Sequence, residues 1–174
     1  MIRVAILTIS DRAARGEAED QSGPAIAQIV QEQLPATVVQ GQIVPDERAQ
    51  IEAALIVWAD SRQVDLILTT GGTGFAVRDV TPEATQAVVE RPAPGIAEAM
   101  RLASLQVTPH AMLSRATAGI RGRTLIVNLP GSPKAVRENL AVILPVLPHA
   151  VELLQQGSQP VAYQHARPGE HGKP

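Results

Sequence analysis

The chain has 174 residues, of which 45% are hydrophobic, 18% are charged and none is cysteine. This length and apolar content fit one domain with its own core, and the lack of cysteine excludes disulfides, thiolate metal sites and a cysteine nucleophile. A net charge of −2 and an aromatic content of 2% argue against nucleic acid and anionic membrane surfaces as partners, because such binding draws on a basic field or on stacking side chains.

Three short apolar runs rich in β-branched residues predict buried strands over residues 2–9, 64–70 and 124–129. The run over 38–44 is interrupted by polar residues and a glycine, so we expect a strand near an edge of the sheet. Strands and helices therefore alternate, which predicts an α/β domain with a mostly parallel sheet. Helical periods of apolar residues lie between and after these runs, over 26–34, 51–58, 96–107 and 136–154.

Helix starts are marked by hydroxyl residues that precede proline in the first turn. Ser22, Thr81 and Ser132 are the predicted N-caps, since a side-chain oxygen at this position accepts a free backbone N–H. The last helical period contains Pro145 and Pro148, and we expect a kink or break there because proline removes a helical hydrogen bond.

The apolar periodicity stops near Gly157. We therefore expect one domain over residues 1–156 and a flexible C-terminal tail over 157–174, which is rich in Pro, Gly and His. Met1 leads directly into a strand, without the apolar stretch and cleavage site of a secretory signal, so the cytoplasm is the expected compartment.

A glycine-rich segment follows the second of the three buried strands. Gly71, Gly72, Thr73 and Gly74 open from the carboxyl end of that strand, where ligands bind in open α/β sheets. Glycines allow backbone N–H groups to approach an anion closely, so the loop is a candidate phosphate site. The alternative is a turn that only reverses the chain. The sequence lacks the glycine signatures of P-loop and dinucleotide folds, so any phosphate is bound by another scheme.

Two aspartates lie near the same expected edge of the sheet. Asp79 follows the glycine loop, and Asp46 follows the strand at 38–44. A carboxylate beside a phosphate is favourable mainly with a hard cation between them, and Mg²⁺ takes one or two carboxylates together with phosphate oxygens. Asp79 is therefore a candidate magnesium ligand and Asp46 a weaker one. The alternative is that Asp79 is a simple surface or capping aspartate and that Asp46 is the N-cap of the helix that follows it.

A second strand-to-helix turn follows the strand at 124–129. Pro130, Gly131 and Ser132 precede a helix, whose free N–H groups carry a partial positive charge and make a second candidate anion site. An ordinary turn is the alternative here as well. Ser104 and Ser114 have no role that spacing reveals, and the four histidines lack any metal-ligand spacing.

Taken together, the blocks at 68–74, 78–85, 111–115 and 128–133 closely resemble the molybdopterin adenylyltransferase family of the MogA/MoaB type, which is shared with the G domain of gephyrin. The resemblance covers about residues 2 to 156. It implies a three-layer α/β/α domain of the molybdopterin-binding fold, assembled as a homotrimer. It also implies transfer of AMP from ATP to the terminal phosphate of molybdopterin, with Mg²⁺ and release of pyrophosphate, and possible delivery to a molybdenum-insertion protein.

The resemblance assigns roles to individual residues. Asp79 and Asp46 match the family's catalytic, metal-organising carboxylates. The nucleotide and its phosphates would be held by Gly71, Gly72, Thr73, Gly74, Pro130, Gly131 and Ser132. Molybdopterin would be bound by Ser10, Asp11, Thr73, Ser104, Ser114 and Asn128.

Two other functions stay open at this point. The first is a protein of the same fold that binds molybdopterin without adenylating it. The presence of both Asp46 and Asp79 favours the enzyme over this alternative. The second is a nicotinamide-nucleotide hydrolase domain with a similar glycine-rich fold. In the favoured reaction the attacking phosphate oxygen is already an anion, so positioning and charge neutralisation replace a strong general base.

Overall fold

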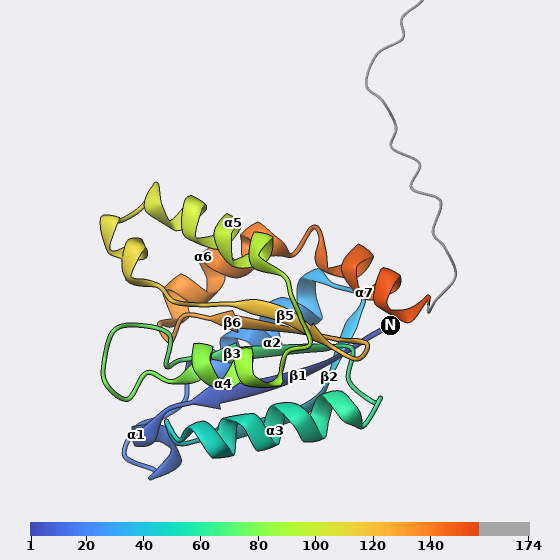
Figure 1. Cartoon of the computed structure of the whole chain (residues 1–174). Helices are drawn as coiled ribbons and strands as arrows, with labels where there is room; N and C mark the ends of the chain where they lie inside the picture. The colour runs from blue at the N-terminus through green and yellow to red at the C-terminus, as the bar shows by residue number, and fades with distance from the viewer. Residues whose placement is uncertain (157–174) are drawn as a thin grey trace, which may run out of the picture.

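The computed structural model describes residues 1–156, and the tail expected over 157–174 lies outside the described residues. Its centre is a six-stranded sheet in the order β2-β1-β3-β6-β5-β4 (Figure 1). The strands are β1 (Ile2–Ile9), β2 (Ala36–Val44), β3 (Leu66–Thr70), β4 (Arg91–Pro92), β5 (Ala118–Arg121) and β6 (Thr124–Leu129).

Four of the six strands run parallel, as the apolar runs predict. β1 pairs in parallel with β2 and β3, and β3 pairs in parallel with β6. β2 lies at the edge, which confirms the expectation for the interrupted run, and its register shifts between Val4 and Ala5 of β1. β5 and β4 are antiparallel additions that the sequence analysis did not predict. Gly122, with φ of 55°, lies in the tight turn between β5 and β6.

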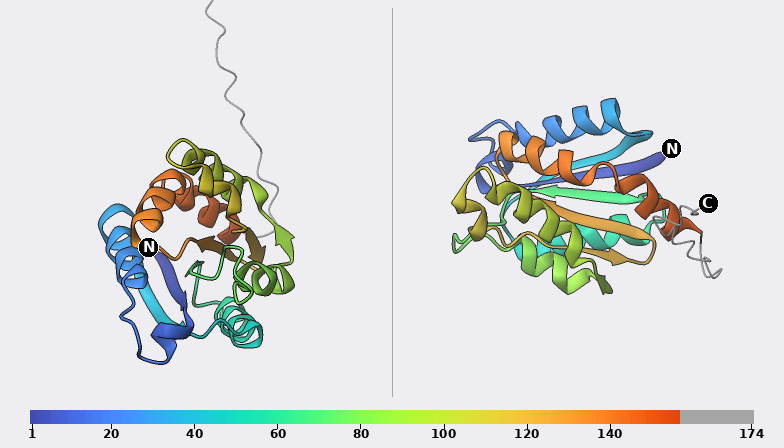
Figure 2. Two further views of the ribbon diagram at one scale, coloured as in Figure 1. Left: turned by 90° about the vertical axis from the view of Figure 1, so that its left-hand side faces the viewer. Right: turned by 90° about the horizontal axis from the view of Figure 1, so that it is seen from above.

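Helices cover both faces of the sheet, which confirms the three-layer arrangement (Figures 1 and 2). One face packs against α2 (Ser22–Gln33), α5 (Pro94–Leu105), α6 (Pro133–Ile143) and α7 (Leu147–Gln155), and the other packs against α3 (Arg48–Asp60) and α4 (Thr81–Val88). Alternate residues of β1 serve the two cores, with Val4 and Ile6 on the first face and Ala5 and Leu7 on the second. Two short helices, α1 (Asp11–Ala14) and the 3₁₀ helix η1 (Pro109–Leu113), complete the fold.

The predicted helix boundaries are partly correct. Ser132 is an N-cap, since its Oγ accepts from the Ala135 N–H at 3.3 Å. The predicted caps at Ser22 and Thr81 are wrong, because the N-cap positions of α2 and α4 are Gln21 and Val80 and neither side chain caps. The break at Pro145 and Pro148 is confirmed, because α6 ends at Ile143 and α7 begins at Leu147. No helix within residues 1–156 has both the length and the apolar character to cross a membrane.

The strand register brings three loops to one edge of the sheet. Thr8 of β1 pairs with Thr70 of β3, and Thr70 pairs with Leu129 of β6. The chain leaves these strands at Ser10, at Gly71 and at Pro130, so the three exits are neighbours. This edge contains the candidate site.

Candidate functional site

The glycine loop lies too close to its neighbours to carry side chains. Gly71 and Gly72 have φ of 96° and 64°, the left-handed region that favours glycine. A Cβ at Gly71 would collide with the backbone carbonyl oxygen of Ile9. A Cβ at Gly131 would lie 3.3 Å from the Cα of Gly71, so the two predicted anion loops touch each other through their backbones. The geometry therefore demands glycine for close packing as well as for turning the chain.

Polar side chains fix both loops from below. The Thr81 hydroxyl donates to the carbonyl oxygen of Gly71 at 2.9 Å, and the Thr70 hydroxyl donates to that of Pro130 at 2.7 Å. Asn128 is fully buried, and its amide nitrogen donates to the hydroxyls of Thr69 at 3.0 Å and Thr85 at 2.9 Å. Asn128 therefore joins strands and helix beneath the loops and has no exposed surface for a ligand.

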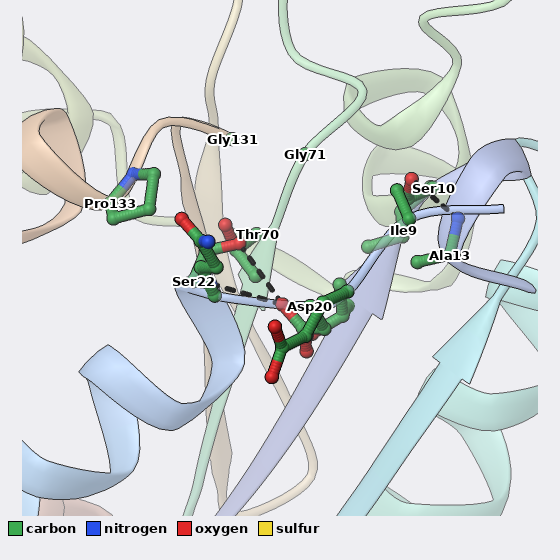
Figure 3. A pocket seen from close by; sticks show the side chains of 13 residues that line it. Ile9, Ser10, Ala13, Asp20, Ser22, Thr70, Gly71, Gly131 and Pro133 are labelled. Atoms are coloured by element: carbon green, nitrogen blue, oxygen red, sulfur yellow. Dashed lines mark hydrogen bonds between the residues drawn. The ribbon is translucent and has the colours of Figure 1, made fainter. Parts of the chain in front are cut away.

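A cavity of about 250 Å³ lies on one side of the loop pair (Figure 3). Ser10, Asp20 and Ser22 line it together with the backbones of Gly71 and Gly131. Its position between the start of α2 and the two loops places several backbone N–H groups nearby. Of the residues expected for the nucleotide, Gly71 and Gly131 line this cavity, whereas Thr73, Gly74 and Pro130 line a different one. Asp20 was not anticipated from the sequence.

A second cavity of about 290 Å³ lies on the other side of the loop pair. Thr73, Ser104 and Ser114 all line it, although they come from distant parts of the sequence. These are three of the residues expected to bind molybdopterin. Asn139 of α6 lines it too and donates to the Ser104 hydroxyl at 3.2 Å, a contact that no sequence pattern revealed.

The remaining residues expected for molybdopterin do not line this second cavity. Ser10 lines the first cavity and caps α1, accepting from the Ala13 N–H at 3.2 Å. The carboxylate of Asp11 accepts from Arg78 at 2.9 and 3.0 Å, and these hydrogen bonds hold the pKa of Asp11 below its usual value. Arg78 also donates to Glu47 at 2.8 Å, so it bridges two acidic residues at the rim.

The two candidate metal ligands both lie against the glycine loop. A Cβ at Gly72 would lie 3.1 Å from Oδ1 of Asp46, and a Cβ at Gly74 would lie 2.9 Å from Oδ2 of Asp79. Asp46 also exchanges hydrogen bonds with Asp11, accepting from the Asp11 N–H at 2.8 Å and donating its own N–H at 3.1 Å. Each carboxylate therefore borders a glycine that leaves room for it.

Neither carboxylate caps the helix that follows it in the sequence, so that form of capping is wrong, although Asp46 accepts from the N–H of Asp11, the first residue of α1. The N-caps of α3 and α4 are Glu47 and Val80, without a side-chain bond, and Asp79 accepts instead from the Ala76 N–H at 3.0 Å. Burial raises the pKa of Asp46, and the charges of Asp11 and Asp79 raise it further. A cation near Asp46 and Asp79 would offset this repulsion.

The two carboxylates fit a hard cation whose remaining ligands come from a bound substrate and from water. Within residues 1–156 no group of three or more His, Cys, Asp or Glu side chains is arranged to hold a metal. Asp46 and Asp79 supply only carboxylate oxygens, and Mg²⁺ commonly binds through one or two carboxylates while phosphate and water oxygens fill its octahedron. The two aspartates beside a candidate phosphate loop match that requirement.

Known proteins resemble this chain over most of its length. Residues 5–149 match the family described as a probable molybdopterin binding domain. The chain is 48% identical over 154 residues to a molybdopterin adenylyltransferase of Helicobacter pylori, covering 88% of each chain. It is 44% identical over 140 residues to the molybdopterin adenylyltransferase of Escherichia coli K12, covering 80% of this chain and 72% of the relative.

Solved structures show the same fold. The molybdopterin biosynthesis enzyme MoaB of Thermus thermophilus superimposes with a TM-score of 0.85 at 53% identity, covering 90% of this chain and 98% of that one. A MogA structure superimposes with a TM-score of 0.82 at 43% identity, covering 87% of this chain and 99% of that one. The match of sequence and fold shows that the chain belongs to the molybdopterin-binding domain family of molybdenum cofactor biosynthesis.

Proposed function

We propose that this protein is a molybdopterin adenylyltransferase, which transfers AMP from ATP to the terminal phosphate of molybdopterin and releases pyrophosphate. The observation that carries the proposal is a pair of touching glycine loops with a cavity on each side. Two substrates that meet at their phosphates need this layout, with one body on each side and the reacting phosphates at the loops. The relatives named molybdopterin adenylyltransferase support the same chemistry.

The reaction needs a substrate oxygen to attack the α-phosphorus of ATP. The new P–O bond forms as the bond to pyrophosphate breaks, and the electron pair leaves with pyrophosphate. Since the attacking phosphate oxygen is already ionised, the protein mainly aligns the groups and offsets negative charge. The candidate donors are backbone N–H groups of residues 72–74 and of the α6 start, where Ser132 is the N-cap. The Gly71 N–H already donates to the carbonyl oxygen of Leu129 at 3.4 Å.

Asp46 and Asp79 are proposed to hold Mg²⁺. When bound, the ion supplies Lewis-acid neutralisation of phosphate charge. Burial and the neighbouring carboxylates raise the pKa of Asp46 although the Asp11 N–H and Arg78 partly offset them, and a bound cation would stabilise the ionised carboxylate further. Asp79 lies at the opposite end of the glycine loop, so the pair brackets the backbone that would face the phosphates.

We also propose that the protein acts as a homotrimer in the cytoplasm and passes its product to a molybdenum-insertion protein. An apolar surface on α5 and the following segment supports self-association. Leu102, Val107 and Met112 are 65%, 60% and 66% exposed there. Exposed apolar side chains that lie together are typical of surfaces that bind another protein.

Replacement of Asp79 by Asn tests the proposed chemistry. With ATP, Mg²⁺ and molybdopterin, the wild type should release pyrophosphate, and Asp79→Asn should lower kcat by about 100-fold or more, because charge neutralisation at phosphate is lost. Molybdopterin affinity should change little, since Asp79 does not line the second cavity. Pyrophosphate release and pterin fluorescence quenching measure the two quantities.

Asp60→Asn is the matched control, because Asp60 lies at the end of α3, where it is paired with Arg121 and lines neither cavity. Its turnover should equal that of the wild type. Full turnover by Asp79→Asn would refute the role of Asp79. A wild type that binds molybdopterin without releasing pyrophosphate would instead favour the non-catalytic binding protein.

A further inference from the structure

Arg115 connects the wall of the second cavity to the segment that carries Asp79. It follows Ser114, which lines that cavity, and its backbone N–H donates to the carbonyl oxygen of Thr73 at 2.8 Å. Its Nε donates to the Gly74 carbonyl oxygen at 2.7 Å and its Nη2 to the Asp79 carbonyl oxygen at 2.6 Å. One guanidinium group therefore holds both ends of the segment from Gly74 to Asp79.

This segment has few other anchors. Phe75 and Val77 are 67% and 97% exposed, so their side chains contribute little packing. Within the segment Ala76 and Asp79 bond to each other, with the Asp79 N–H donating to the Ala76 carbonyl oxygen at 2.9 Å. That contact shapes the turn but does not fix it to the rest of the molecule. The Arg78 side chain is a further anchor, which donates to Asp11 at 2.9 and 3.0 Å and to Glu47 at 2.8 Å, but it is half exposed and holds the segment only at the rim.

The backbone on both sides of Arg115 is itself held by hydrogen bonds. Nη1 of Arg101, on α5, donates to the carbonyl oxygen of Ala116 at 2.7 Å and to that of Ser114 at 3.4 Å. The remaining Nη1 of Arg115 pairs with Glu83 on α4. Burial alone would raise the pKa of Glu83, but the hydrogen bond from Arg115, a backbone hydrogen bond and the positive charges of Arg115 and Arg48 together hold this pKa below its usual value.

We propose that Arg115 is a positioning residue that holds the Asp79 carboxylate beside the glycine loop. The effect of Arg115 on the reaction rests on the proposed function, but its role in holding residues 74–79 in place does not. Arg115 acts through backbone carbonyls and not by contact with a substrate. Only a planar fork serves both carbonyls and Glu83 together, because the single ammonium of lysine is a compact point charge.

Arg115→Lys keeps the charge and removes the fork, and Glu83→Gln is the matched control that leaves both carbonyl contacts in place. In the protein without ligand, Arg115→Lys should speed amide hydrogen exchange over residues 74–79 by about tenfold or more, while exchange in β1 and β3 stays unchanged. Glu83→Gln should stay within about twofold of the wild type at the same amides.

A second measurement follows metal and nucleotide binding without turnover. Arg115→Lys should weaken binding of Mn²⁺ with α,β-methylene-ATP, detected by electron paramagnetic resonance, by about tenfold. In the adenylation assay it should lower kcat more than it raises KM for molybdopterin. Arg115→Gln, which lacks both the charge and the fork, should show the same pattern and is the second variant if Arg115→Lys does not fold.

Wild-type exchange over 74–79 in a folded Arg115 variant would overturn the proposal. So would an equal effect of Glu83→Gln, since the ion pair and not the fork would then matter. Failure of the wild type to release pyrophosphate would refute the proposed function alone, because hydrogen exchange is measured without any substrate.

Discussion

Asp65 shows how a single buried charge is accommodated in this fold. It is 5% exposed at the start of β3 and accepts from the Arg3 side chain at 2.7 and 3.0 Å and from the Arg3 backbone N–H at 2.8 Å. Gln155 of α7 adds a hydrogen bond at 2.9 Å. Burial alone would raise the pKa of Asp65, but the contacts with Arg3 outweigh it and hold the pKa below its usual value.

Asp65→Asn should therefore destabilise the protein by about 3 kcal/mol at neutral pH, because Arg3 loses its ionic partner and faces an amide donor. The native pKa is lowered, so the contribution of Asp65 is present above the ordinary aspartate range and is lost as pH falls through the native pKa. The gap between variant and wild type should shrink in acid. Urea unfolding at several pH values measures it, and a gap independent of pH would contradict the assignment.

At the level of residues, the sequence predicted candidate functional residues better than it predicted the contacts that those residues make. Glycine and aspartate are informative because few positions demand them, so residue type and position pointed to the loop at Gly71 and to the candidate ligands Asp46 and Asp79, which the structure places against that loop. Asn139 and Arg115 were not, because an Asn within a helix and an Arg after a serine have no distinctive spacing. Their partners come from other elements, and only the folded chain brings them together.

At the level of elements, the start of α2 is fixed by a carboxylate from outside the helix. Oδ1 of Asp20 accepts from the N–H groups of Ser22 and Gly23, each at 3.0 Å, and Oδ2 accepts from the Thr8 hydroxyl at 2.6 Å. A negative side chain here satisfies free N–H groups and meets the positive end of the helix dipole. It also joins α2 to β1 at the first cavity.

Asp20→Ala should lower the free energy of unfolding by about 1–2 kcal/mol, because two helix N–H groups and one hydroxyl lose their acceptor. Glu19→Ala, a change of the same kind in the neighbouring residue, serves as the control and should alter stability by less than about 0.5 kcal/mol. Chemical denaturation measures both. Equal effects of the two substitutions would show that Asp20 does not cap α2.

The same helix shows why boundaries are harder to predict than elements. The apolar runs that became β1, β3 and β6 are almost uninterrupted and bury both faces of the strand, so the runs alone predicted them. Ser22 resembles a cap in sequence, yet the Asp20 carboxylate accepts the free N–H groups of the first turn, including that of Ser22 itself. β4 has two residues and gains its identity only from pairing with β5, which local sequence cannot show.

At the level of the whole molecule, helices cover both faces of the sheet, but the outer side of α5 is exposed. Leu102 and Met112 border a shallow cavity on the outer side of that helix, which lies on the outside of the molecule in Figure 1. A surface of this kind gains by burial against another copy, with roughly 25 cal/mol for each Å² of apolar area removed from water. The homotrimer expected from the family resemblance would use such a face.

Leu102→Ser with Met112→Ser should therefore shift the protein from trimer to monomer at micromolar concentration, as seen by size-exclusion chromatography with light scattering. The control pair is Val57→Ser with Val146→Ser, whose side chains are 65% and 52% exposed elsewhere. That pair should leave the trimer intact. A wild type that elutes as a monomer would refute the trimer, and an unaffected double variant would place its interface on another face.

The contact between Gly71 and Gly131 also limits how this protein can change. Neither Gly71 nor Gly72 has room for a Cβ, and both hold φ values that other residues rarely adopt. The surface that they form consists of main-chain atoms, so a substitution cannot change its shape without disturbing the fold beneath it. An inhibitor that draws its affinity from these amides would therefore leave the chain few viable routes to resistance by point mutation.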